Sequence, residues 1–197
     1  MPVPTADLDA QLQLTDGRLQ LRPWQARDAE PLREAARESL ASVGRWLPWC
    51  HAGYDLADAR AWIAHCRESL ARGEQYALPV LDHADGRLLG GVGLNQLDPQ
   101  HRSANLGYWV RQSRQGEGIA AAAARLLARY GFEQLELARI EILAHPQNQA
   151  SRRTAEKIGA RFQAVERRQL PALGGAVEMA VYVLTRTDRQ PGAAIPA

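Results

Sequence analysis

The chain has 197 residues and a mass of 21.7 kDa, which fits one domain with a sizeable core. Hydrophobic residues make up 46% of it and charged residues 23%, a balance typical of folded globular proteins and unlike that of disordered chains. A formal net charge of +2 is too small to indicate nucleic-acid binding, and no apolar run is long enough to cross a bilayer.

The amino end and the two cysteines indicate where the protein acts and whether it uses disulfides or a metal. Residues 1–14 lack the basic start and apolar run of a secretory signal, so we expect a cytoplasmic protein. The two cysteines, Cys50 and Cys66, cannot build a disulfide framework. Each stands beside a histidine, but adjacent side chains point apart on a helix and rarely chelate together, so we expect no metal site.

The first part of the chain predicts a short strand pair and two helices. Residues 12–22 alternate apolar and polar side chains around an Asp-Gly turn, which indicates a hairpin or a bent strand. Asp28 can cap a helix that runs to about Leu40 with one apolar face. Asp55 is expected to cap the next helix, which ends at Gly73.

An irregular segment between these two helices carries Trp46 and Trp49 among glycine and proline residues. Large aromatic side chains supply apolar area together with a polar group, so this pair either plugs the core or walls a ligand pocket. In the second case both tryptophans are candidates for binding a substrate.

The middle of the chain predicts an antiparallel meander of three strands, over residues 76–81, 88–97 and 104–110. The loop that follows leads into an alanine-rich helix, which is expected to end at Gly131. Residues 106–143 thus form a strand-helix-strand unit, and its two strands are expected to be parallel with a right-handed connection.

The last part of the chain completes a single domain, predicted over residues 1–185. Its expected elements are a buried strand (139–143), a helix (148–158), a closing hairpin (162–168 and 177–184) and a loose tail (186–197). Basic side chains crowd into this part and form either a solvated face or a surface that meets a phosphorylated ligand. They are Arg152, Arg153, Lys157, Arg161, Arg167 and Arg168.

The loop from Gln115 to Ala120 is the most informative segment. A helix start leaves its first N–H groups unpaired and carries partial positive charge, so it can bind a diphosphate. Gly116 and Gly118 let such a ligand approach the backbone without a Cβ in the way. The loop lacks the glycine pattern of a dinucleotide fold and the G-K-S/T of a Walker loop, which leaves a coenzyme A thioester as the fitting ligand.

At this loop the sequence resembles the GNAT (Gcn5-related) N-acetyltransferase family, whose phosphate loop reads Q/R-x-x-G-x-G/A. Gln115, Gly118 and Ala120 match that pattern, and the strand before it reads G-Y-W-V over residues 107–110. A second block over residues 145–159 carries N-x-x-S-x-x-x-x-E-K-x-G and is similar to the ribosomal-protein (RimJ/RimL type) branch. The resemblance spans roughly residues 12–185.

The resemblance implies a mixed α/β GNAT fold: a mostly antiparallel sheet of about seven strands with a splayed parallel pair, flanked by about four helices. It also implies acetyl-CoA as co-substrate, without a metal, and Ser151 as the hydroxyl near the thioester sulfur. Ser151 and Asn148 could instead simply cap a helix. The residues that the resemblance assigns to the acetyl-CoA site are Tyr108, Trp109, Val110, Gln115, Gly116, Glu117, Gly118, Ile119, Ala120 and Asn148.

The group that deprotonates the amine stays open at this point. Glu74 and Asp98 each border a predicted strand near the site, and His145 precedes a proline at a strand end. Many relatives have an acidic residue in the strand before G-Y-W, where this chain has Asn105, so a base at that position is not available.

The sequence thus predicts an acetyl-CoA-dependent enzyme that acetylates a primary amine, first of all the N-terminal α-amino group of a protein such as a ribosomal protein. A small-molecule amine acetyltransferase, for a polyamine, amino acid or drug, is the alternative enzyme. A non-catalytic acyl-CoA-binding module is the alternative outside enzymes. The acceptor, the acyl-chain preference and the oligomeric state, for which a homodimer is one option, are left open.

Overall fold

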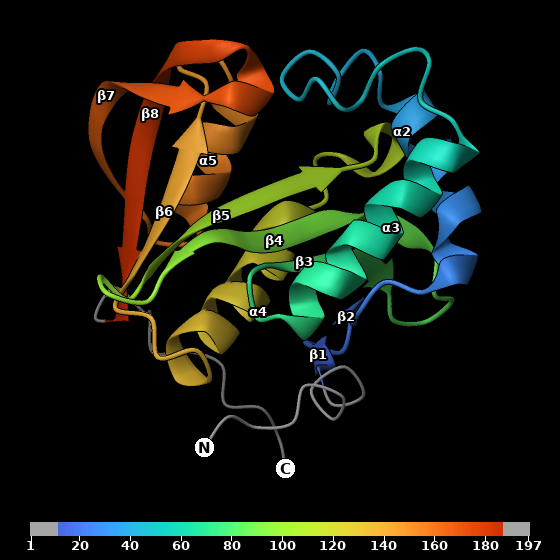
Figure 1. The fold of residues 1–197 in the computed structure, drawn as a ribbon, viewed down its shortest axis with the longest axis horizontal. Helices are drawn as coiled ribbons and strands as arrows, with labels where there is room; N and C mark the ends of the chain where they lie inside the picture. The colour runs from blue at the N-terminus through green and yellow to red at the C-terminus, as the bar shows by residue number, and fades with distance from the viewer. Residues whose placement is uncertain (1–11, 187–197) are drawn as a thin grey trace.

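One open sheet of eight strands organises residues 12–186, the part of the chain that the computed structural model describes (Figure 1). The strand order is β1-β2-β3-β4-β5-β6-β8-β7. The strands are β1 (Leu14–Thr15), β2 (Leu19–Leu21), β3 (Tyr76–Asp82), β4 (Leu88–Asp98), β5 (Ser103–Val110), β6 (Arg139–Ala144), β7 (Arg161–Leu170) and β8 (Gly175–Thr185).

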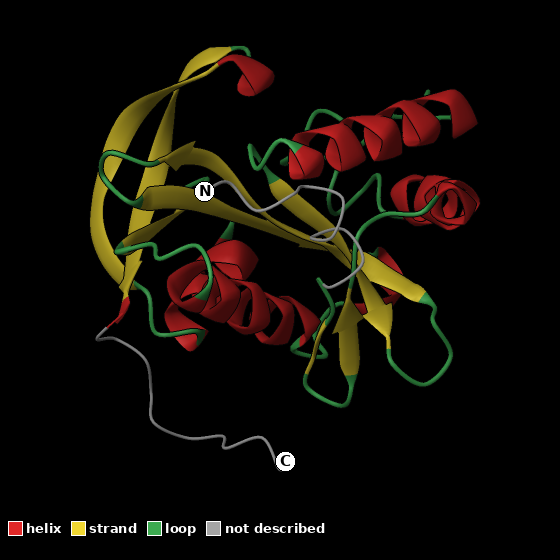
Figure 2. Ribbon diagram, turned by 60° about the horizontal axis from the view of Figure 1, so that its bottom comes forward, coloured by secondary structure: helices red, strands yellow, loops and turns green. Residues whose placement is uncertain are grey.

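Helices cover both faces of this sheet, as Figure 2 shows. They are α2 (Ala29–Glu38), α3 (Leu56–Ala71), α4 (Ile119–Glu133) and α5 (Gln149–Lys157), with short 3₁₀ turns at Ala26–Asp28, Gln112–Arg114 and Pro171–Leu173. Within residues 12–186, none of the helices is both long and apolar enough to span a membrane.

The predicted mixed α/β sheet is confirmed, including the antiparallel meander β3-β4-β5 and the parallel neighbours β5 and β6. The strand count is eight because residues 12–22 form a true hairpin, β1 with β2, rather than one bent strand. The predicted tail, apart from Arg186, lies outside the described residues, as do residues 1–11.

The two predicted helix caps have different outcomes. Asp55 caps α3 as expected, because its carboxylate accepts the N–H groups of Ala57 and Asp58. Asp28 does not cap α2: its carboxylate is buried and accepts two hydrogen bonds from the Arg22 guanidinium, at 2.7 and 2.8 Å. A buried carboxylate needs a charged partner more than a helix end needs a cap, so the ion pair prevails.

Gly131 was expected to end the helix after the glycine loop, but it lies inside α4. A Cβ at this position would come within 3.0 Å of Leu94 and 3.1 Å of Leu137. The glycine therefore serves close packing of α4 against the sheet rather than helix termination. The other ends differ less: α2 stops at Glu38 instead of about Leu40, and α5 spans residues 149–157.

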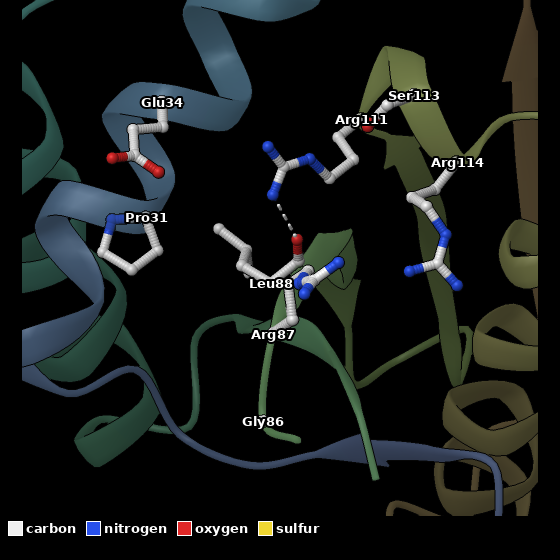
Figure 3. Close-up of a pocket in the computed structure, with 8 residues that line it drawn as sticks. All are labelled: Pro31, Glu34, Gly86, Arg87, Leu88, Arg111, Ser113 and Arg114. Carbon is white, nitrogen blue, oxygen red and sulfur yellow. Dashed lines mark hydrogen bonds between the residues drawn. The ribbon is translucent and has the colours of Figure 1, made fainter. Parts of the chain in front are cut away.

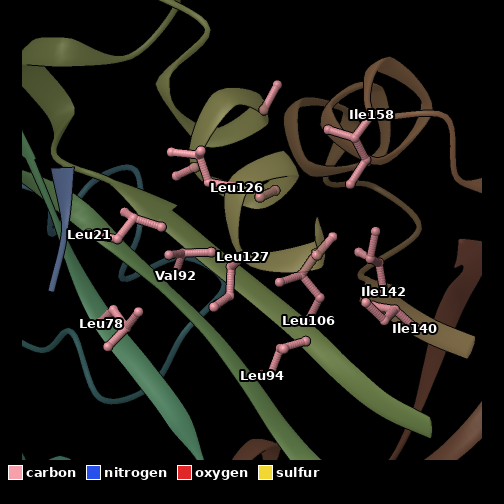
Figure 4. Close-up of a cluster of buried hydrophobic side chains, with 14 of the residues drawn as sticks. Leu21, Leu78, Val92, Leu94, Leu106, Leu126, Leu127, Ile140, Ile142 and Ile158 are labelled. Carbon is pink, nitrogen blue, oxygen red and sulfur yellow. The ribbon is translucent and has the colours of Figure 1, made fainter. Parts of the chain in front are cut away.

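Two hydrophobic cores lie on opposite faces of the sheet. The larger one joins α4 and α5 to the even-numbered residues of β5 and β6, such as Leu106 and Ile140 (Figure 4). The smaller one joins α2 and α3 to the other face. Successive side chains of a strand point to opposite faces of the sheet, so each strand residue can meet a ligand from one face only.

Candidate active site

The parallel strands β5 and β6 form a fork. They pair at Ser103 with Arg139, at Ala104 with Ile140 and at Asn105 with Glu141, and the pairing ends there. Beyond this point β5 continues beside β4 as far as Val110, whereas β6 continues beside β8 as far as Ala144. Figure 1 shows the two strands diverging from their common end.

Backbone groups of β5 face this gap. The N–H of Arg111 donates to the carbonyl of Leu89 on β4. Because successive residues of a strand direct their backbone groups to opposite sides, Val110 and Tyr108 direct theirs into the gap. The side chain of Gln115 confirms this orientation, since its amide donates to the Val110 carbonyl over 3.1 Å. The Val110 N–H beside it is directed toward whatever fills the fork.

The glycine loop places the start of α4 at the open end of the fork. Gly118 is the N-cap residue and has a left-handed backbone, with φ of 77°, as Gly116 has with φ of 84°. Nothing lies within 4 Å of where a Cβ of Gly116 would be. Since the first N–H groups of a helix have no intrahelical partner, those of α4 are available to an anion.

The acidic residue of this loop, Glu117, is engaged by two arginine side chains. The Arg114 guanidinium donates to its carboxylate over 2.7 Å and, as the largest cause, holds its pKa below the usual range. Arg18 of the β1–β2 hairpin donates to the backbone carbonyl and the carboxylate of the same residue. Glu117 therefore fastens the loop to its surroundings.

Lys157 is a site residue that the sequence did not single out. Its Nζ lies 3.6 Å from where a Cβ of Gly118 would be, directly beside the start of α4. A cation near a positive helix end is unfavourable unless an anion joins them. Of the basic residues in this part of the chain, Arg152 instead binds Tyr182 and Arg168 binds Glu141. Composition alone could not separate Lys157 from these neighbours.

Ser151 lies against the gap-facing strand. Its Oγ lies 3.4 Å from the hydroxyl of Tyr108, which in turn donates to the Ser151 carbonyl over 2.9 Å. Burial raises the pKa of Tyr108 to about 12, so its hydroxyl stays protonated. The N-cap of α5 is Asn148, whose side chain accepts the Ser151 N–H over 3.1 Å. The capping role is thus real for Asn148 and wrong for Ser151.

The tryptophan segment, residues 45–49, spans the two arms of the fork. Trp46 lies 5.1 Å, between ring centroids, from His145, which follows β6. Trp49 lies 5.2 Å from Trp109 of β5. Both tryptophans are half-buried. Trp46 thus contacts the end of β6 and Trp49 contacts β5. The Trp109 side chain lies on the face of the sheet opposite α4.

Of the three candidate bases, Glu74, Asp98 and His145, only His145 lies at the fork. Asp98 pairs with Ser103 at the far end of β5 and binds His101, and Glu74 is exposed beside Arg72 before β3. The expectation that these two carboxylates lie near the site is therefore wrong. His145 does lie at the fork, but its Nδ1 accepts the Gln147 N–H over 3.2 Å. That bond leaves the proton on Nε2 in the neutral ring, so His145 is a donor there.

A cavity of about 360 Å³ lies on the outer side of the segment that leads into the glycine loop (Figure 3). Arg111 and Arg114 point into it, but both already bind carboxylates, Glu38 and Glu117. The third arginine of the lining, Arg87, lies 3.6 Å from the Asp85 carboxylate, so each arginine of the cavity has a carboxylate partner. Its lining residues are Pro31, Glu34, Gly86, Arg87, Leu88, Arg111, Ser113 and Arg114.

No group of three His, Cys, Asp or Glu side chains within residues 12–186 is placed to hold a metal ion.

Asn105 stands at the last rung of the fork, where its amide donates to Asn95 over 3.0 Å. Its oxygen is buried and has no hydrogen-bond partner among the described residues.

An open sheet with a forked parallel pair and a glycine loop at the fork defines a class of acyl-transferring α/β domains. The family model for the acetyltransferase (GNAT) domain matches residues 18–161, and the chain belongs to this family. It is an N-acetyltransferase of the RimJ/RimL-like branch, as the following relatives bear out.

YdaF of Bacillus subtilis, which carries the provisional name of a ribosomal N-acetyltransferase, is 34% identical over 145 residues. This match covers 71% of the present chain and 75% of YdaF. The ribosomal-protein-serine acetyltransferase of Escherichia coli is 30% identical over 84 residues, which are 43% of this chain and 47% of that protein.

Solved structures agree in fold. A protein of Vibrio cholerae, provisionally named a ribosomal-protein-serine acetyltransferase, superposes with a TM-score of 0.79 at 28% identity. That match covers 89% of this chain and 98% of the other. RimJ of Mycobacterium smegmatis, solved in complex with CoA-disulfide, gives a TM-score of 0.76 at 26% identity and covers 92% of this chain and 88% of RimJ.

Proposed function

We propose that the protein transfers an acetyl group from acetyl-CoA to the N-terminal α-amino group of a protein, such as a ribosomal protein. The observation that carries this proposal is the fork: β5 and β6 part after Asn105 and Glu141, next to the start of α4. The names of YdaF and of the Escherichia coli relative support the choice of acceptor. Such an acceptor implies a cytoplasmic enzyme.

The residues of the fork fit coenzyme A. Its diphosphate needs N–H donors and positive charge, which the start of α4 and Lys157 provide. Its pantetheine arm carries amides, which can pair with the gap-facing backbone groups of Tyr108 and Val110. The Asn148 oxygen is engaged at the start of α5, so its NH₂ group is the part that can donate to the arm.

Acetyl-CoA supplies the acetyl group as a thioester, and the chain positions it. The Val110 N–H donates toward the carbonyl oxygen on which negative charge develops, which lowers the barrier to attack. Ser151 provides the hydroxyl for the departing sulfur. In the free protein this hydroxyl donates to the Tyr108 oxygen, and it would turn from Tyr108 to donate to the sulfur when the thioester is bound. Direct attack by the amine needs no covalent enzyme intermediate.

An α-amino group suits the weak basicity of this site. Its pKa of roughly 7.7 to 8.0 lies well below the roughly 10.4 of a lysine side chain, so water can carry its proton away. The tryptophan segment, with one contact on each arm of the fork, would frame the acceptor as it enters.

A panel of amines tests this function, with release of free thiol from acetyl-CoA as the measurement. Peptides with free serine or alanine N-termini are expected to react faster than the same peptides with a blocked N-terminus and one lysine. Faster turnover of polyamines or free amino acids would establish a small-molecule enzyme instead. Binding of acetyl-CoA without turnover of any amine would point to a non-catalytic module.

A further inference from the structure

Glu38, the last residue of α2, holds the segment that joins β5 to the glycine loop. Its carboxylate accepts from the Arg111 side chain, from the Ser113 N–H at 3.0 Å and from the Ser113 hydroxyl at 2.7 Å. The next residue, Ser39, accepts the Gln112 N–H over 3.0 Å. Three consecutive residues, 111–113, are thus tied to the end of one helix.

Arg111 adds a second anchor to the same segment. The Arg111 guanidinium donates to the Leu88 carbonyl over 3.1 Å, as drawn in Figure 3. The backbone N–H of Arg111 donates to the Leu89 carbonyl. The Arg111 side chain is 14% exposed and that of Glu38 30%, so the pair is partly shielded from water and salt. A bidentate contact of this kind fixes direction as well as distance.

The position of this anchor matters for the cofactor. Val110, whose N–H faces the fork, comes directly before Arg111, and Gln115 follows Ser113 by two residues. Gln115 binds the Val110 carbonyl. The structure assigns Glu38 the role of a positioning residue that sets the glycine loop, and with it the α4 start, for the diphosphate of acetyl-CoA. This inference rests on the proposed function of the fork.

The same helix offers a matched control at its other end. Asp28, just before α2, forms a bidentate pair with Arg22, and the two side chains are only 8% and 10% exposed. It contacts no part of residues 111–118 in the hydrogen bonds of the described chain. Loss of this pair should cost stability without disturbing the glycine loop.

The test compares Glu38→Gln, Glu38→Asp and Asp28→Asn in the full chain. Calorimetry measures acetyl-CoA affinity, steady-state kinetics separate KM from kcat, and thermal melting measures stability. We expect Glu38→Gln to weaken acetyl-CoA binding and raise its KM at least about tenfold, with kcat at saturation changed less than about twofold. Glu38→Asp should restore part of the affinity, and Asp28→Asn should lower the melting temperature with KM unchanged.

The outcomes separate this inference from the proposed function. If wild-type protein fails to bind acetyl-CoA, the function itself is wrong. If the wild type binds and Glu38→Gln binds equally well, Glu38 is structural and the positioning role is overturned. Should Glu38→Gln not fold, Ser113→Ala removes one bond to the same carboxylate and is expected to weaken binding about threefold. Unchanged binding in that variant would also overturn the role.

Discussion

The two halves of β5 have the same backbone chemistry and different surroundings. Residues 103–105 pair with β4 on one side and with β6 on the other, whereas residues 106–110 pair with β4 alone. The reason lies one strand away: β6 stays with β8 to the rung of Ala144 with Ala180, and so leaves β5. The gap-facing backbone groups of the open half have no strand partner on that side, so this is where a ligand can add hydrogen bonds.

The paired half should govern stability rather than binding. Ile140 is fully buried and faces Ala104 across the last rungs of the fork. Ile140→Ala is expected to lower the free energy of unfolding by about 2–5 kcal/mol, because it leaves a cavity in the main core. Urea unfolding measures this loss, and Ile140→Val, at about 0.5–1.5 kcal/mol, serves if the alanine variant does not fold. An equal loss of acetyl-CoA affinity in the folded fraction would erase the contrast between the halves.

The open half should govern turnover. Ser151→Ala is expected to lower kcat at least about tenfold with acetyl-CoA affinity unchanged, because it removes the hydroxyl that meets Tyr108. Thr154→Ala on the same helix is the control, since the Thr154 hydroxyl binds only the Ala150 carbonyl of its own helix among the described contacts. Equal rates for wild type and Ser151→Ala would remove the serine from the chemistry.

The helix end beside the open half should show a smaller electrostatic effect. Lys157→Gln is expected to raise the KM for acetyl-CoA about two- to fivefold, since a solvent-exposed charge near a helix end is worth about 0.3–1 kcal/mol. Lys157→Arg should keep most of the affinity, and added salt should weaken the wild type toward the glutamine variant. A salt-independent difference between the two would contradict a charge contact.

Acid should reveal the Glu38 anchor through stability. Hydrogen bonds from Arg111, followed by those from Ser113, lower the pKa of Glu38 to about 2 from a usual 4.5. Its contribution is therefore complete above about pH 4.5 and is lost as the pH falls toward 2. Arg114 and Glu34 are the further charges around Arg111. The difference in free energy of unfolding between wild type and Glu38→Gln, about 1 kcal/mol, should shrink over that range. A pH-independent difference in urea unfolding would exclude the ionised anchor.

Local signals predicted much of this fold. The β3-β4-β5 meander, the alanine-rich α4 and the Asp55 cap depend on neighbours in the sequence, and all three are confirmed. Gly131 misled because a glycine that allows close packing looks the same in a sequence as one that ends a helix.

Long-range contacts explain what the sequence could not predict. Glu38 and Arg111 are 73 residues apart, and no local pattern links them. Asp98 borders a strand, as expected, but a border does not say which end of the sheet it occupies. The fork itself followed from the resemblance and not from the residues, because the rung at which two strands part is set by a third strand.

Amide hydrogen exchange with and without coenzyme A tests the fork most directly. The account predicts that the Tyr108 and Val110 amides, which face the gap, exchange more slowly when coenzyme A is added. The Ala104 amide, already in the paired half, should exchange at the same rate in both states. Binding of coenzyme A with no added protection at Tyr108 and Val110, or no binding at all, would contradict the account.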